Sequence, residues 1–140
     1  MEFFGTLDDK GRISLPSKVR GSLPENLLVL TKGVNQCVWV FTPDEWEKFS
    51  SKYINSVSLS LNKQLAIQRH FFAPKTEVEI DKAGRIAIPP SLREYAGLSR
   101  ECKILEVFNS LEIWDSRQYE SHAEANAVQV PAILEEMGPL

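Results

Sequence analysis

Two arginines, Arg12 and Arg85, each follow an aspartate by four residues, Asp8 and Asp81, with a glycine directly before the arginine. An aspartate and an arginine at this spacing across a turn can pair and hold the turn in shape. The guanidinium then offers its remaining N–H groups to an anion. Exposed ion pairs are also common and contribute little to stability, so a purely structural clasp is the competing interpretation. These residues alone leave both interpretations open.

The repeated carboxylates of Asp8 and Asp81 also raise the alternative of an acid–base pair. We do not favour it, because an adjacent arginine keeps a carboxylate ionised, whereas such a pair must hold one proton. The sequence contains no His-x-x-x-His, glycine-rich phosphate loop, nucleophile elbow or dinucleotide fingerprint. We therefore expect no enzyme activity, no metal, no cofactor and no small-molecule ligand. The histidines and cysteines are expected to be packed or surface side chains: His70, His122, Cys37 and Cys102.

The Asp–Arg element occurs twice because the chain contains an internal repeat. Residues 8–16 and 81–89 share the pattern D-x-x-G-R-I-x-[LI]-P at an offset of 73, and the same offset relates residues 38–46 to residues 111–119. In a chain of 140 residues, each copy is about half a domain and too small to bury its own core. We therefore expect the copies to pack on each other in one pseudo-twofold domain.

Each copy is expected to contain the same elements in the same order. Short β-type runs at residues 4–7 and 13–15 flank the first turn, where aspartate and glycine favour a type I turn. The turn is therefore either a β-hairpin or a tight strand corner. A helical turn that ends at a glycine follows in each copy, at residues 17–21 and 90–97. Two strands come next, at residues 27–30 and 38–41 in the first copy and at residues 103–107 and 111–114 in the second. A capped helix then begins at residue 43 in the first copy and at residue 115 in the second. Trp46, Phe49 and Tyr53 are expected to form a buried aromatic stripe.

These elements predict a single domain over residues 1–140. Its expected parts are a first repeat at about 3–55, a linker helix at about 58–72, a second repeat at about 75–126 and a C-terminal tail at about 127–140. The tail contains Pro131, Gly138 and Pro139, so we expect a helix extension that frays.

Composition and charge place the chain among soluble globular proteins, with 43% hydrophobic and 25% charged residues. No apolar run approaches the roughly 18 residues of a membrane span, and nothing resembles a secretory signal, so we expect a cytoplasmic protein. The net charge of −3 is unevenly distributed, because residues 101–140 carry −6 and residues 1–100 carry +3. An acidic tail on a basic body is compatible with DNA binding.

Repetition favours a nucleic-acid ligand over a small metabolite. Two turns that present basic residues on one pseudo-symmetric face would offer paired cations to an extended anion, and glycine allows the backbone to approach a phosphate closely. The expected DNA-binding residues are Lys10, Gly11, Arg12, Lys82, Gly84 and Arg85, with Asp8 and Asp81 stabilising the loops.

The two D-x-x-G-R units, L-R-E-Y-A-G-L at residues 92–98 and F-N-S-L-E-I-W-D at residues 108–115 resemble the MraZ family of bacterial transcriptional regulators. The resemblance covers about residues 1–119. This family is similar to AbrB-type factors, whose swapped-hairpin barrel is normally made by two chains. The resemblance implies an α+β fold in which two tandem swapped-hairpin repeats form one pseudo-twofold β-barrel domain with flanking helices.

The resemblance also implies a function. MraZ-like proteins bind double-stranded DNA at short promoter-proximal direct repeats upstream of the division and cell-wall operon that encodes them, form ring-shaped homo-oligomers and associate with the nucleoid. The family's D-x-x-x-R element falls here on Asp8, Arg12, Asp81 and Arg85, while Ala83 replaces the lysine found at Lys10. Secondary phosphate contacts are expected from Lys18, Arg20 and Arg93. The competing class is an AbrB-like protein-interaction or antitoxin module whose acidic C-terminal segment binds a protein.

Overall fold

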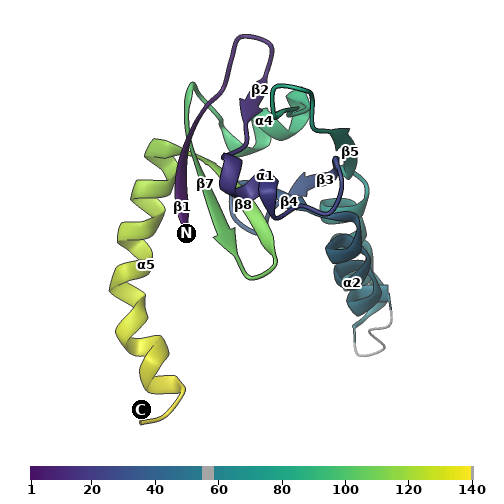
Figure 1. The fold of residues 1–140 in the computed structure, drawn as a ribbon. Helices are drawn as coiled ribbons and strands as arrows, with labels where there is room; N and C mark the ends of the chain where they lie inside the picture. The colour runs from purple at the N-terminus through teal and green to yellow at the C-terminus, as the bar shows by residue number, and fades with distance from the viewer. Residues whose placement is uncertain (55–58, 140) are drawn as a thin grey trace.

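The computed structural model describes residues 1–54 and 59–139, which form an α+β fold of two sheets and several helices (Figure 1). The predicted α+β class is therefore confirmed. A two-stranded sheet pairs β2 (Arg12–Ser14) with β6 (Arg85–Ala87). The other sheet has six antiparallel strands, in the spatial order β1 (Glu2–Thr6), β7 (Glu101–Val107), β8 (Ser110–Asp115), β4 (Val38–Phe41), β3 (Leu27–Lys32) and β5 (Thr76–Glu79).

The order of the six strands is symmetric: counted from either edge of the sheet, equivalent strands of the two copies occupy the same positions. The offset of 73 relates β1 to β5, β3 to β7 and β4 to β8. β1 pairs with β7, and β5 pairs with β3, so the first strand of each copy extends the sheet of the other copy. Neither copy completes its sheet alone, which agrees with the expectation that each is too small to fold by itself.

Two strand pairs mark the pseudo-twofold axis. Ile13 lies opposite Ile86 in the β2–β6 pair, and Trp39 lies opposite Glu112 in the β4–β8 pair. Each pair joins residues that are equivalent at the offset of 73, so the axis passes through the middle of both sheets. Trp39 Nε1 donates to Glu112 Oε2 at 3.0 Å. The predicted pseudo-twofold arrangement is therefore present.

The six-stranded sheet is open, unlike the closed β-barrel that the resemblance implied. The sheet ends at β1 and β5, and no strand pairing joins these two edges within residues 1–54 and 59–139. The physical reason lies in the path of the chain. Each edge strand leaves the large sheet at its Asp–Arg turn and continues into the small β2–β6 sheet, which packs on one face of the large sheet.

The turn after β1 is a strand corner and not a β-hairpin. The long pairing of β1 is with β7 and that of β2 is with β6. Only a single bridge, between Leu7 and Ile13, connects the two arms of the turn. The chain therefore passes at this turn from the large sheet, which contains β1, to the small sheet, which contains β2.

The core lies between the two sheets. Ile13 and Ile86 point inward from the small sheet and have no exposed surface. They pack against the inward face of the large sheet, together with side chains of α1 (Ser17–Gly21) and α4 (Pro90–Ala96). The buried large-sheet residues in this cluster alternate along each strand: Leu28, Leu30, Val38, Val40, Cys102, Ile104, Leu111 and Ile113. This alternation is the period-two pattern of a strand with one buried face.

The opposite face of the large sheet is covered by helices. α2 (Pro43–Ile54) begins where Thr42 Oγ1 accepts the Glu45 N–H at 3.2 Å, as the predicted cap requires. The expected aromatic stripe is present, with Trp46 buried and Phe49 and Tyr53 half-buried, and it packs on Phe41 and Trp39. The expected linker helix is found as α3 (Leu61–Ile67) and the π-helical turn η1 (Gln68–Phe72), while Ser58 lies outside the described residues.

The last helix, α5 (Ser116–Glu136), includes most of the C-terminal tail. Asp115 caps it by accepting the Gln118 N–H at 3.2 Å. Residues 127–136 of the tail form the expected helix extension, which continues past Pro131. Figure 1 shows that its first part lies beside the sheet and that its second half extends beyond it. Its exposed large apolar residues are Val128, Val130, Ile133, Leu134 and Met137 at its end. No helix in the described part of the chain meets the length and hydropathy of a membrane span.

Candidate functional site

The first loop (residues 8–12) is built around the carboxylate of Asp8. Asp8 Oδ1 accepts the backbone N–H groups of Lys10 and Arg12, each at 2.9 Å, and Oδ2 accepts Arg12 Nε at 2.9 Å. The Gly11 N–H donates to the Asp8 carbonyl at 3.1 Å and closes the turn. Gly11 has a φ of 78°, which favours glycine because other residues are strained there. The aspartate, the glycine and the arginine are thus each required by the loop geometry.

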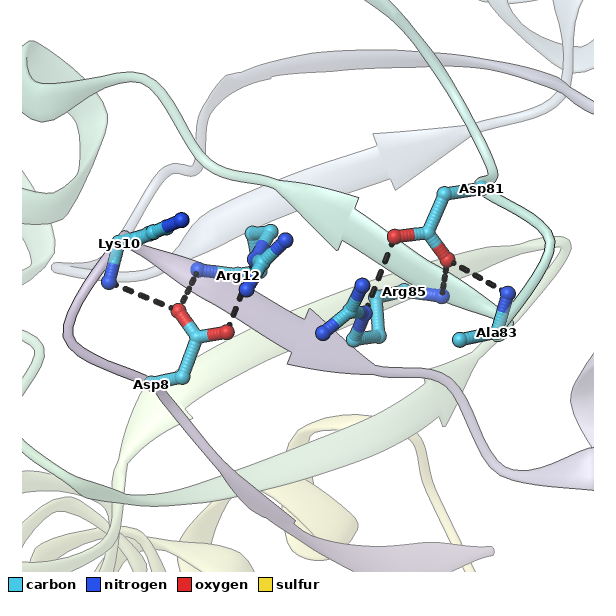
Figure 2. Close-up of polar contacts among 6 residues, drawn as sticks. All are labelled: Asp8, Lys10, Arg12, Asp81, Ala83 and Arg85. Carbon is cyan, nitrogen blue, oxygen red and sulfur yellow. Dashed lines mark hydrogen bonds and ion pairs between the residues drawn. The ribbon is translucent and has the colours of Figure 1, made fainter.

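The second loop (residues 81–85) repeats this geometry (Figure 2). Asp81 Oδ1 accepts the N–H groups of Ala83 and Arg85 at 2.9 Å, and Oδ2 accepts Arg85 Nε at 3.0 Å. Gly84 has a φ of 79°. The predicted Asp–Arg pairs therefore exist in both copies. The two arginine side chains are similarly accessible, since Arg12 is 31% exposed and Arg85 is 33% exposed.

Both aspartates are held in the ionised form. The Arg12 backbone N–H lowers the pKa of Asp8 most, and the Arg12 side chain and Lys10 N–H add to it, against the opposing effect of desolvation. The pKa of Asp81 is lowered in the same way, with the Arg85 backbone N–H as the main cause. Each arginine is bound to its aspartate through Nε, so its Nη groups take no part in this ion pair.

The two arginines belong to one two-stranded ribbon. In β2–β6, Arg12 lies opposite Ala87 and Ser14 lies opposite Arg85. Alternation sends these four side chains to the solvent side, because Ile13 and Ile86 between them point into the core. Arg12 and Arg85 are therefore diagonal neighbours on one outward face. Figure 2 shows both arginine side chains between the two aspartates.

Ser14 and Ala87 are members of this face that we did not predict. They are exposed and stand beside the arginines because of the register of the β2–β6 pair. The alternation of residues after each arginine already placed Ser14 and Ala87 on the arginine side of their own strands. Only the pairing of the two strands brings all four residues together.

Arg20 and Arg93 approach the loops from the opposite copy. Arg93 Nε donates to the Ile88 carbonyl at 2.9 Å, and its guanidinium lies over Gly11, where an added Cβ would be 2.6 Å from Arg93 Cζ. Arg20 Nε donates to the Leu15 carbonyl at 3.2 Å, and its guanidinium covers Gly84 in the same way. We expected these two residues as secondary phosphate contacts, and the structure places both directly against the loops.

The predicted lysines are placed differently from one another. Lys10 and Lys82 are exposed at the tips of the two loops, at adjacent but not equivalent positions, since Lys10 corresponds to Ala83 and Asp9 to Lys82. The Lys18 Nζ atom instead lies 3.3 Å from Met1 Sδ. Met1 precedes β1, at the end of that strand away from the loop, so the structure does not bring Lys18 to the site.

The histidines and cysteines are packed or hydrogen-bonded within the fold. His70 Nε2 donates to the Gly33 carbonyl at 2.8 Å, and His122 packs on the Trp114 ring with centroids 4.9 Å apart. Cys37 and Cys102 are both free and buried, and burial raises the pKa of Cys102 to about 11. Asp8 and Asp81 do not form a carboxylate pair, because each binds its own arginine. Among the described residues, no group of three or more side chains suited to a metal ion is present.

Two copies that interleave about one axis, and present matched Asp–Arg loops on one ribbon, define a tandem-repeat α+β protein with a single composite site. The sequence profile of the MraZ protein family, which is described as antitoxin-like, matches twice, over residues 2–70 and 71–137. The chain belongs to the MraZ family. The two matches meet near η1, where the structure passes from one copy to the next.

Similar proteins from three bacteria cover 86–99% of the chain. A protein of Treponema denticola is 43% identical over 99% of this chain and 96% of its own length. A protein of Treponema pallidum is 45% identical over 86% of this chain and 82% of its own length. A protein of Acetivibrio thermocellus is 38% identical over 99% of this chain and 96% of its own length. All three are named transcriptional regulator MraZ.

Proposed function

We propose that this chain is a non-enzymatic transcriptional regulator that binds double-stranded DNA through the outward face of the β2–β6 ribbon. The observation that carries the proposal is the pair of arginines, Arg12 and Arg85, each fixed by an aspartate and aimed outward from one two-stranded ribbon. A ribbon of this kind fits the major groove, which is about 12 Å wide. The names of the relatives support the regulatory role.

The spacing of the arginines suits base reading. Diagonal neighbours in an antiparallel pair lie about 7–8 Å apart, which is close to two base-pair steps of about 3.4 Å each. Since Nε of each arginine is engaged by its aspartate, the Nη groups are presented in a fixed orientation. Each arginine then contacts one guanine edge, and a good contact of this type gives about 1–3 kcal/mol of discrimination against a wrong base.

The loop tips supply contacts to the DNA backbone. Lys10 and Lys82 are exposed at the tips of the two loops that carry the arginines, and we expect them to contact phosphates on either side of the groove. Gly11 and Gly84, which we expected to contact DNA, are instead buried under the guanidinium groups of Arg93 and Arg20, so the phosphate contacts are assigned to the two lysines. Such contacts add affinity without sequence preference and weaken as salt is raised.

Self-association completes the proposal. The ribbon carries few cations, so one subunit should bind weakly, and a ring-shaped homo-oligomer that engages several direct repeats gains affinity through avidity. Val130, Ile133, Leu134 and Met137 follow helical spacing along one face of α5, and all four are exposed in the single chain. Phe108 is also exposed, at the tip of the β7–β8 turn. These apolar surfaces support contacts between subunits.

The biological setting belongs to the same proposal. The regulator is expected in the cytoplasm, associated with the nucleoid, where it binds promoter-proximal direct repeats upstream of its own division and cell-wall operon. The swapped-hairpin relation to AbrB-type factors is supported by the exchange of β1 and β5 between the two copies. The barrel closure of those factors is not part of this proposal, since the sheet is open.

Fluorescence anisotropy tests DNA recognition. The protein is titrated at near-physiological salt into DNA from upstream of its own gene and into a shuffled DNA of equal composition. Arg12→Ala and Arg85→Ala are each expected to weaken binding to the upstream DNA by about 5- to 150-fold, with little effect on the shuffled DNA, because one base contact is lost. Lys63→Ala, which removes an exposed cation of α3, is the matched control and should bind like the wild type.

The result that contradicts DNA recognition is equal, weak binding to both DNAs that neither arginine variant changes. That outcome would favour the second candidate function, an AbrB-like protein-interaction or antitoxin module. The antitoxin-like description of the family and the exposed apolar face of α5 favour this alternative specifically. A partner protein that purifies with the wild type, and is lost from Leu134→Asp, would then identify α5 as its binding surface.

A further inference from the structure

The two loops are connected crosswise by arginines, and the proposed function does not use this connection. The first loop belongs to the first copy, yet the guanidinium that lies over Gly11 comes from Arg93 of the second copy. The Ile88 N–H donates to the Gly11 carbonyl at 2.9 Å, and the Ile88 carbonyl accepts Arg93 Nε at 2.9 Å. Two hydrogen bonds through Ile88 thus connect Arg93 to the backbone of the first loop.

The second loop is held in the same way by the first copy. The guanidinium of Arg20 lies over Gly84. The Leu15 N–H donates to the Gly84 carbonyl at 2.9 Å, and the Leu15 carbonyl accepts Arg20 Nε at 3.2 Å. Arg20 and Arg93 are equivalent at the offset of 73, as are Leu15 and Ile88. The arrangement therefore occurs twice, on both sides of the axis.

The chemistry of this contact requires arginine. A planar guanidinium can lie flat on a glycine Cα while its Nε–H, at the edge of the plane, donates to a carbonyl. Lysine has no donor at the Nε position and no plane, so it makes only one of the two contacts at a time. Any side chain at Gly11 or Gly84 would occupy the space of the guanidinium, which is a second reason for glycine in both loops.

We propose that Arg93 and Arg20 are positioning residues for DNA recognition: Arg93 orients the first loop and its Arg12, and Arg20 orients the second loop and its Arg85. This inference rests on the proposed function. It adds that each DNA-reading arginine depends on an arginine of the opposite copy. Arg12 follows Gly11 directly, and Arg85 follows Gly84, which places each reading residue next to the backbone that is held.

The first test measures the loops without DNA. Amide resonances of Gly11 and Gly84 are compared in two-dimensional ¹H–¹⁵N spectra of wild type, Arg93→Ala and Arg20→Ala. Arg93→Ala is expected to shift Gly11 and leave Gly84 near its wild-type position, and Arg20→Ala is expected to do the reverse. Each variant is therefore the matched control of the other. Equal shifts of both glycines in both variants, or no shift in either, would overturn the proposal whether or not the protein binds DNA.

The second test measures coupling in DNA binding with the upstream DNA described above. Arg93→Ala alone is expected to weaken binding by about fivefold or more. Fivefold is the smallest effect expected when one base contact is lost. The double variant Arg12→Ala/Arg93→Ala should bind within about twofold of Arg12→Ala, because the first loop is already disabled. In Arg12→Ala/Arg20→Ala the two effects should multiply, because different loops are affected. Multiplication in both double variants would contradict the proposed pairing.

Salt dependence separates positioning from phosphate contact. A residue that binds a phosphate lowers the slope of log K against log salt by about one when it is removed, whereas a positioning residue leaves the slope unchanged. We expect an unchanged slope for Arg93→Ala, and we expect Arg93→Lys to remain defective although it keeps the charge. A slope reduced by about one, with full rescue by lysine, would make Arg93 a phosphate contact and overturn its positioning role.

Discussion

The first and second loops share one geometry but differ at their tips. In both, an aspartate accepts two backbone N–H groups and an arginine Nε at 2.9–3.0 Å, and a glycine has a φ near 78°. The tip residues differ, with Asp9-Lys10 in one copy and Lys82-Ala83 in the other. The shared residues are those whose side chains or φ values build the turn, whereas the tip residues contribute only backbone groups to it. Structure therefore constrains the frame of the loops and leaves their tips free to differ.

The axis residues allow the strongest test of this equivalence. Ile13→Ala and Ile86→Ala each remove most of a fully buried side chain at the centre of the β2–β6 pair. Each is expected to lower the free energy of unfolding by about 2–5 kcal/mol, as large-to-small core substitutions do. Urea unfolding followed by circular dichroism measures both. Values that differ by more than about 2 kcal/mol would show that the two copies do not contribute equally to the shared core.

The loop glycines are expected to give the next largest effect. Gly11→Ala and Gly84→Ala each place a Cβ at a positive φ and within 2.6 Å of an arginine Cζ. We expect a loss of about 1–3 kcal/mol in each case from backbone strain, with weaker DNA binding. Gly21→Ala is the control, because a Cβ there meets nothing within 4 Å and Gly21 does not have a positive φ. If Gly21→Ala destabilises as much as Gly11→Ala, the loop conformation is not the cause.

Acid pH tests the two carboxylates. Folding lowers the pKa of Asp8 and Asp81, so the stability they contribute is present above the unfolded value of about 3.9 and is lost as pH falls through the folded pKa. Wild type should therefore lose more stability between pH 7 and pH 3 than Asp8→Asn or Asp81→Asn. Urea midpoints at both pH values measure this difference. A full wild-type loss in both variants would assign the acid sensitivity to other groups.

The two loops also show which parts of the molecule could be predicted from sequence. The Asp–Arg pairs were predictable because aspartate and arginine lie four residues apart and the turn between them is short. Helix starts at Thr42 and Asp115 were predictable for the same reason, since the cap and its N–H partner are three residues apart. Contacts of this kind can be predicted because both partners lie within a few residues of each other in the sequence.

Contacts between distant residues were not predictable in the same way. Strands β2 and β6 have three residues each, too few for their hydrophobic pattern to select a partner, and only their pairing places Ser14 beside Arg85. The placement of Arg93 over Gly11 depends on the same pairing. The open sheet was missed because closure depends on how the two edge strands approach each other, which the repeat alone does not fix.

The loop tips give the smallest expected effect and the finest comparison of the two copies. Lys10→Ala and Lys82→Ala should each reduce the slope of log K against log salt by about one and leave the preference for upstream DNA intact, because a phosphate contact carries no base information. Ala83→Lys makes the second tip resemble the first and should steepen the slope by about one. Anisotropy titrations between about 50 and 200 mM salt measure all three. A change in sequence preference in any of them would show that the tips read bases as well, and that the difference between the loops is part of specificity.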